Sequence, residues 1–113
     1  MDIEIDNSRP FTVANVSGVL DVLGIESFTE TLQEHACGEE ARLAIDLSQL
    51  KMIDSSGLSA MISLATRARL TSGQVVLVAP SPFVSGILEV THLDHWFDVC
   101  DNLDDAARRL GLE

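Results

Sequence analysis

The chain has 113 residues, of which 46% are hydrophobic and 22% are charged, with four Phe and one Trp. This length and composition predict one globular domain over residues 1–113 with a mainly aliphatic core. Seven Lys and Arg against 18 Asp and Glu give a net charge of -11, which argues against direct binding to nucleic acid or to an anionic lipid surface. A basic protein partner is the better expectation.

The sequence shows no sign of a membrane span, a secretory signal or a metal site. The opening MDIEIDNSRP has acids where a signal peptide would have lysines, and no apolar run approaches the roughly 20 residues that cross a bilayer. We expect a cytoplasmic protein without membrane insertion and without a cofactor. Cys37 and Cys100 show no metal-ligand spacing, so buried free thiols are the first expectation and a redox pair is the alternative.

The first third of the chain predicts two strands and a helix. Ile3 and Ile5 alternate with acids, and a turn-like cluster separates them from the apolar stretch 11–16, as in two short antiparallel strands. Apolar residues from Ile25 onward then recur with helical spacing, and Gly38 follows them. This pattern predicts a helix of about three turns.

The rest of the chain predicts alternating strands and helices. We expect strands at 42–47, 74–79 and 96–100, and helices from about 57 to 72, over 83–90 and after a cap at Asn102. The first two of these strands flank a helix of crossover length and should be parallel. The sequence therefore predicts an α/β domain, with a mixed β-sheet and helices packed mainly on one face.

The stretch Met52–Leu58, which reads MIDSSGL, leads into a helix that we expect to begin near Gly57. A helix start leaves N–H groups without partners, and Ser55 or Ser56 could accept a hydrogen bond from one of them. A capping box would also need Glu or Gln three positions after the cap, and neither serine is followed by one. This reading predicts a helix start without an acidic side chain of its own.

A catalytic serine is a weak alternative. The nucleophile elbow of hydrolases reads Gly-x-Ser-x-Gly, and Ile53 stands where its first glycine should be. His35, His92 and His95 could approach the serines in space, but a lone histidine is more often structural than catalytic. We expect no catalytic residue, and we expect that the protein is not an enzyme.

A regulatory serine is the second alternative to simple capping. The N-terminus of a helix carries partial positive charge and N–H groups, so it could hold a phosphate on Ser55 without a basic side chain. Phosphorylation would add about -1.5 to -2 charges beside Asp54 and would change the surface that a protein partner meets. This behaviour suits a reversible binding module.

Four stretches occur together at a recognisable spacing, and their positions are Gly18–Asp21, Asp46–Leu50, Met52–Leu58 and Ser72–Val78. With them, the sequence from about residue 16 to 113 resembles the STAS domains of bacterial anti-sigma factor antagonists. The resemblance has two departures. Val19 stands where these antagonists often have Glu, and Thr91–Asp94 replaces their more usual turn.

This resemblance implies a phosphorylation switch that regulates transcription. In similar antagonists, the serine after the motif's Asp is phosphorylated by an anti-sigma factor that is also a serine kinase of the histidine-kinase-like ATPase superfamily. That serine corresponds to Ser55 here, with Ser56 as the rival. The unphosphorylated antagonist sequesters the anti-sigma factor and releases a sigma factor, and a serine phosphatase resets the switch.

The resemblance also implies a partner-binding face at the start of the central helix. Its residues are Asp21, Asp54, Ser55, Ser56, Gly57, Ser59 and Ser63. Ala60 and Leu64 lie between the apolar stripe and the polar face of this helix. We expect them in the core, and an exposed apolar strip for docking is the alternative.

Some STAS domains are not phosphorylated and act as scaffolds. The resemblance therefore leaves a second function open, in which the protein is a scaffold subunit of a lipid-transport ATPase complex or of a stress-sensing assembly.

Overall fold

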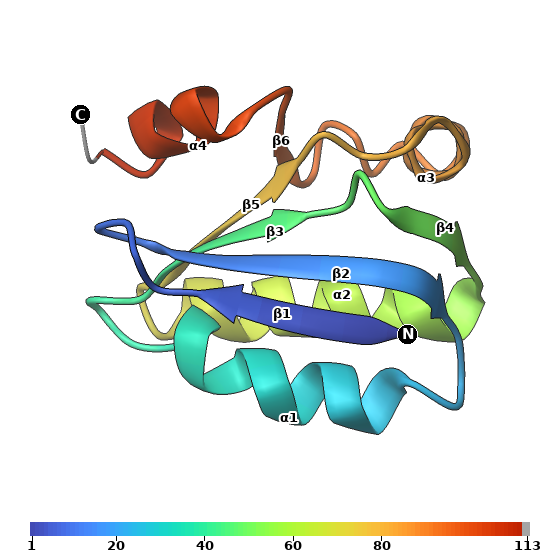
Figure 1. The fold of residues 1–113 in the computed structure, drawn as a ribbon, viewed down its shortest axis with the longest axis horizontal. Coiled ribbons are helices and arrows are strands. Elements are labelled where there is room, and N and C mark those ends of the chain that lie inside the picture. Colours follow the sequence, from blue (N-terminus) through green and yellow to red (C-terminus); the bar gives the residue numbers. More distant parts are fainter. Residues whose placement is uncertain (112–113) are drawn as a thin grey trace.

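The computed structural model describes residues 1–111 and shows an α/β domain with a mixed sheet (Figure 1). The strands are β1 (Asp2–Asp6), β2 (Thr12–Leu20), β3 (Arg42–Asp46), β4 (Leu50–Ile53), β5 (Gln74–Val78) and β6 (Asp98–Cys100). The helices are α1 (Ile25–Ala36), α2 (Ser55–Leu70), α3 (Pro82–Val90) and α4 (Leu103–Arg109). Within the described residues, no helix is both long enough and apolar enough to span a membrane.

The sheet has the strand order β1-β2-β3-β5-β6, and β4 pairs with β2 beside this row. The pair β1 and β2 is antiparallel, and every other pair is parallel. The structure confirms the antiparallel start, the parallel pair β3 and β5, and the short last strand at the edge of the sheet.

Strand β2 is shared between two parallel neighbours. Its first half, from Thr12 to Asn15, pairs with β3, and its end, from Gly18 to Leu20, pairs with β4. The register shifts between Gly18 and Val19, and Gly18 has a φ of 86°, a conformation that glycine adopts without strain. This irregularity lets one strand serve both neighbours.

Helices α1 and α2 lie side by side under one face of the sheet, while α4 lies on the opposite face (Figure 1). The larger core cluster joins side chains of α1, α2 and α3 to the sheet, with Phe28, Leu64 and Leu88 among them. The smaller cluster lies on the α4 side, where Ala106 and Leu110 meet β2, β3 and β5. The expectation of helices mainly on one face is therefore confirmed.

Strand β4 was not predicted. Its residues follow a buried, exposed, exposed, buried pattern, because Leu50 and Ile53 enter the core while Lys51 and Met52 face outward. A strand of four residues with no alternation gives little signal in the sequence. The prediction for β2 was also too short by four residues, since its second half pairs with this unpredicted strand.

Candidate functional site

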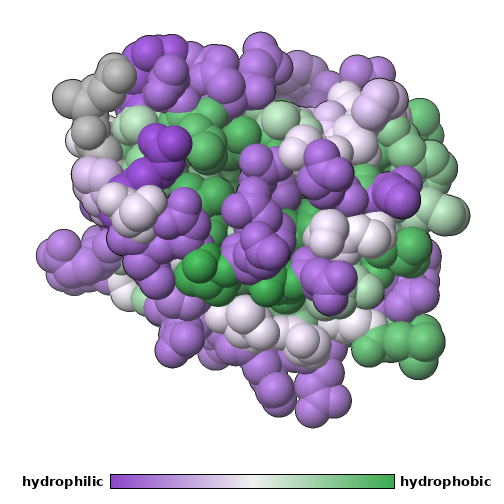
Figure 2. Space-filling view, viewed as in Figure 1, coloured by the Kyte–Doolittle hydropathy of each residue, from purple (hydrophilic) through white to green (hydrophobic). Residues whose placement is uncertain are grey.

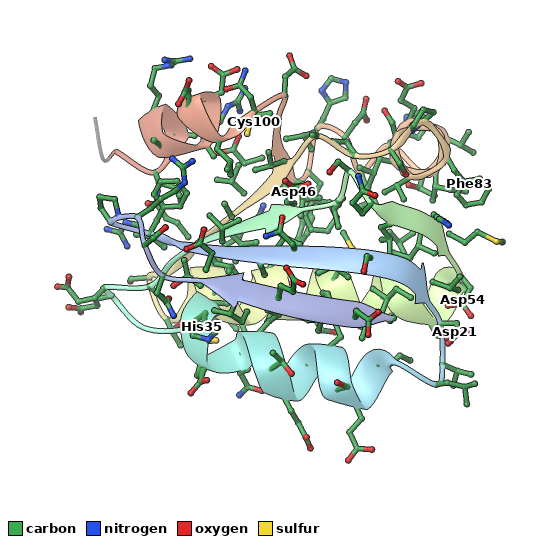
Figure 3. The ribbon with its side chains drawn as sticks, in the orientation of Figure 1. Asp21, His35, Asp46, Asp54, Phe83 and Cys100 are labelled. Carbon is green, nitrogen blue, oxygen red and sulfur yellow. The ribbon has the colours of Figure 1, made fainter. Side chains whose placement is uncertain are left out.

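Two aspartates meet at the carboxyl ends of the parallel strands β2 and β4. Leu20 and Ile53 are register partners at the ends of these strands, and Asp21 and Asp54 are the next residues. The backbone N–H of Asp54 donates to the carbonyl oxygen of Leu20 over 3.2 Å. Figure 3 shows both aspartates at the same end of the molecule, where α2 begins and α1 approaches. We name this region the aspartate end.

Asp54 caps helix α2, which corrects the prediction for the helix start. The carboxylate of Asp54 accepts a hydrogen bond of 2.9 Å from the N–H of Gly57, and its carbonyl accepts one of 2.9 Å from the N–H of Leu58. The helix begins at Ser55, two residues earlier than expected. The predicted cap on Ser55 or Ser56 is therefore wrong, and this helix start does have an acidic side chain of its own.

The two serines differ in exposure. Ser55 is the first residue of α2 and is exposed, whereas Ser56 is half-buried. Ser56 also lines the groove between α1 and α2. Because Asp54 supplies the cap, the hydroxyl of Ser55 has no part in closing the first turn. Ser55 is therefore the more accessible of the two serines from solvent.

Gly57 is buried beneath this turn and holds α2 close to strand β2. A Cβ at this position would lie 2.5 Å from the carbonyl oxygen of Leu20, 2.8 Å from the Cγ of Leu20 and 2.9 Å from the Cγ1 of Ile53. Contacts of this length, one of them to a backbone oxygen, leave no space for a side chain. The glycine of the Asp-Ser-Ser-Gly stretch therefore sets the distance between the helix start and the two strand ends.

Asp21 organises the neighbouring turn. Its carboxylate accepts a hydrogen bond of 3.0 Å from the N–H of Leu23, and its carbonyl accepts one of 2.9 Å from the N–H of Gly24. Asp side chains stabilise turns in this way because they replace a backbone acceptor. The turn connects β2 to α1 and leaves Val22 and Leu23 exposed.

The polar face of α2 continues the site along a shallow groove. Ser59 and Ser63 are exposed, and with Ser56 they line a groove of about 460 Å³ between α1 and α2. Ala60 and Leu64 are only 7% and 2% exposed and belong to the larger core cluster. The core expectation for these two residues is confirmed, and they form no exposed apolar strip.

His35 lies away from the serines, and the two cysteines lie apart from each other. His35 is near the end of α1, at the far end of the molecule from Asp54 (Figure 3). Cys37 packs against the larger core cluster, while Cys100 belongs to the smaller cluster on the other face, and both thiols are free. Burial raises the pKa of the Cys100 thiol, which keeps it protonated and unreactive.

Comparison with known proteins places the chain in a family. A family model described as the STAS domain matches residues 2–106. The chain therefore belongs to the STAS domain family, and the match extends beyond the region that the sequence motifs covered.

Three relatives show the extent of the likeness. A Bordetella bronchiseptica protein named BtrV, a candidate anti-sigma factor antagonist, is 26% identical over 107 residues, which cover 95% of this chain and 92% of that protein. The crystal structure of a candidate anti-sigma factor antagonist from Thermotoga maritima has a TM-score of 0.84 at 17% identity, with 96% and 93% of the two chains covered.

The third relative is SpoIIAA of Bacillus, an anti-sigma factor antagonist. Its unphosphorylated form has a TM-score of 0.75 at 18% identity, with 99% of each chain covered. Its phosphorylated form has a TM-score of 0.66 at 18% identity, with 95% and 98% covered. At these identities, the structural likeness shows a shared fold.

Proposed function

We propose that this protein is an anti-sigma factor antagonist, which binds an anti-sigma factor through the aspartate end and is switched by phosphorylation of Ser55. The observation that carries the proposal is the position of Ser55, exposed at the first residue of α2 while Asp54 provides the cap. A modification there would change the surface and leave the buried packing of Gly57 unaltered. The names of the relatives support the same function.

The chemistry of the switch follows from charge. A phosphate on Ser55 would add about -1.5 to -2 charges next to Asp54 and Asp21. The positive end of the α2 dipole would tolerate this charge within the protein. An incoming surface that had been complementary to two carboxylates would then meet a third and larger negative group, so affinity would fall.

The proposal assigns no catalytic step to this chain. Its partners are an anti-sigma factor that is also a serine kinase, and a serine phosphatase that restores the hydroxyl. The contact residues are Asp21, Asp54, Ser55, Ser56, Ser59 and Ser63, and Gly57 supports them from below. The proposed function also implies that the protein is located in the cytoplasm, where bacterial transcription takes place.

The test is phosphorylation by the cognate anti-sigma factor kinase. We expect ATP and the kinase to add one phosphate to the parent protein and to Ser56→Ala, and none to Ser55→Ala, as read by phosphopeptide mass spectrometry. Ser55→Asp should weaken kinase binding by at least about tenfold in calorimetry, because it places a permanent negative charge at the switch position.

Two results would contradict this proposal. Phosphate found only on Ser56 would move the switch to the groove between α1 and α2. Co-purification with a membrane ATPase, independent of the residue at position 55, would favour the scaffold function instead.

A further inference from the structure

Exposed apolar side chains gather at the aspartate end. Within residues 1–111, seven large hydrophobic side chains are exposed, and five of them lie near the ends of β2 and β4, in the turn between β2 and α1, or at the start of α3. These five are Val19 (40% exposed), Val22 (66%), Leu23 (90%), Met52 (52%) and Phe83 (46%). Figure 2 shows hydrophobic surface over α3 and β4 and again over the turn between β2 and α1. We name these five residues the apolar collar.

Three parts of the fold position the collar residues. Val19 and Met52 are register partners on β2 and β4, one residue before the strand ends. The Asp21 turn presents Leu23, and a groove of about 300 Å³ joins Leu23 to Val19. Phe83 stands at the start of α3 and shares a groove of about 270 Å³ with residues of β4.

The folding of this chain does not explain why apolar residues occupy the collar positions. A side chain that is 90% exposed, such as Leu23, gains little from burial within its own domain. Single exposed apolar residues are common on protein surfaces, but a group beside polar residues is typical of a protein interface. Val19 and Met52 lie two residues before Asp21 and Asp54 in the chain, and Ser55 follows Asp54, so the collar adjoins the residues of the proposed switch.

Charge restricts what can cover this surface. The chain has a net charge of -11, and two carboxylates, those of Asp21 and Asp54, lie at the same end of the molecule as Phe83 of the collar (Figure 3). Lys51 on β4 is the one lysine in the sequence. A complementary surface therefore needs apolar side chains opposite the collar and basic side chains opposite the two aspartates.

We propose that the apolar collar determines the affinity for the anti-sigma factor, whose contact surface combines apolar side chains with Arg or Lys. This inference rests on the proposed function for the identity of the partner. The inference assigns two roles to one face. The collar provides the binding affinity, and the phosphorylation state of Ser55 determines whether the partner binds.

The test compares exposed apolar residues inside and outside the collar. Leu23→Ser and Met52→Ser remove collar side chains, while Leu70→Ser and Val90→Ser remove side chains that are 80% and 79% exposed at the far ends of α2 and α3. Binding is measured by calorimetry against the purified cognate anti-sigma factor, and circular dichroism checks each fold. We expect each collar variant to bind at least about tenfold more weakly and the controls to stay within about twofold.

Salt tests the chemistry of the partner surface. Raising NaCl from about 50 to about 500 mM should weaken binding of the parent, and Asp21→Asn should reduce this dependence. Binding that is independent of salt would overturn the basic component of the proposal.

The outcomes separate this inference from the proposed function. If collar variants bind like the parent while Ser55 is still phosphorylated, the collar proposal is wrong and the switch stands. If Ser55 is never phosphorylated but the collar variants lose the anti-sigma factor, the switch fails and the collar stands. If Leu70→Ser and Val90→Ser lose as much affinity as the collar variants, the effect is not local and the collar proposal is wrong.

Discussion

Helices α2 and α4 begin with the same kind of side-chain cap but differ in the first turn. The side chain of Asp54 accepts a hydrogen bond of 2.9 Å from Gly57, and that of Asn102 accepts one of 2.8 Å from Asp105. The first turn of α4 carries Asp104 and Asp105, whereas that of α2 has no acid and carries two serines instead.

This difference shows which residues at the start of α2 are needed for folding and which are not. In α4, carboxylates of the helix itself occupy the positive end of the dipole. In α2, the cap is equally complete, but the next two positions hold neutral hydroxyl groups. The fold does not require serine at Ser55, and this supports our proposal that its hydroxyl is there to be modified.

The largest stability effect should come from Gly57, the third residue of α2. Gly57→Ala places a Cβ 2.5 Å from the Leu20 carbonyl oxygen, so we expect a loss of unfolding free energy near the top of the range of about 1–3 kcal/mol for overpacking. Asp105→Ala, at the equivalent position of α4, should cost less than about 1 kcal/mol, since it removes only a surface pair with Arg108. Urea unfolding measures both, and equal losses would show that Gly57 is not sterically confined.

The two caps should have similar, intermediate effects. We expect Asp54→Ala and Asn102→Ala each to lower the unfolding free energy by about 0.5–2 kcal/mol, because each leaves a first-turn N–H without its acceptor. Asp54→Asn should retain most of the stability, since an amide oxygen can accept the same hydrogen bond. Thermal unfolding compares the three variants, and an Asp54→Ala protein as stable as the parent would contradict the assignment of the cap.

The smallest stability effect should be that of Ser55→Ala. An exposed side chain that makes no capping hydrogen bond should change the unfolding free energy by no more than about 0.5 kcal/mol. Ser56→Ala is the matched control, because Ser56 is half-buried in the groove beside α1. A clear loss of stability in Ser55→Ala, seen in the same urea titration, would mean that this serine has a structural role.

The sequence predicted the central strands because their apolar runs are long and nearly continuous, as in β5 at Gln74–Val78. It did not predict which residue caps α2, because Asp and Ser are both good caps and the choice depends on where the helix begins. That position is set by the contact between Gly57 and Leu20, residues far apart in the chain. The start of α2 therefore depends on a tertiary contact, which a local sequence pattern does not reveal.

The site was predictable to a similar degree. The resemblance grouped Asp21 with Asp54, but the physical reason for their proximity is the pairing of β2 with β4, a strand that periodicity did not reveal. The collar was missed altogether. One signal was available, because Val22 and Leu23 are apolar residues inside a turn, where polar residues are usual.

The division of β2 at Gly18 has a consequence for where substitutions can fall in this chain. The first half of β2 pairs with β3, which is followed in the sheet by β5 and β6. The end of β2 pairs with β4 and leads into the turn at Asp21. Substitutions at the proposed recognition surface therefore fall on the part of the strand that pairs with β4, apart from the register of β2 with β3. The glycine at position 18 thus marks a boundary within one strand between the proposed binding face and the framework of the sheet.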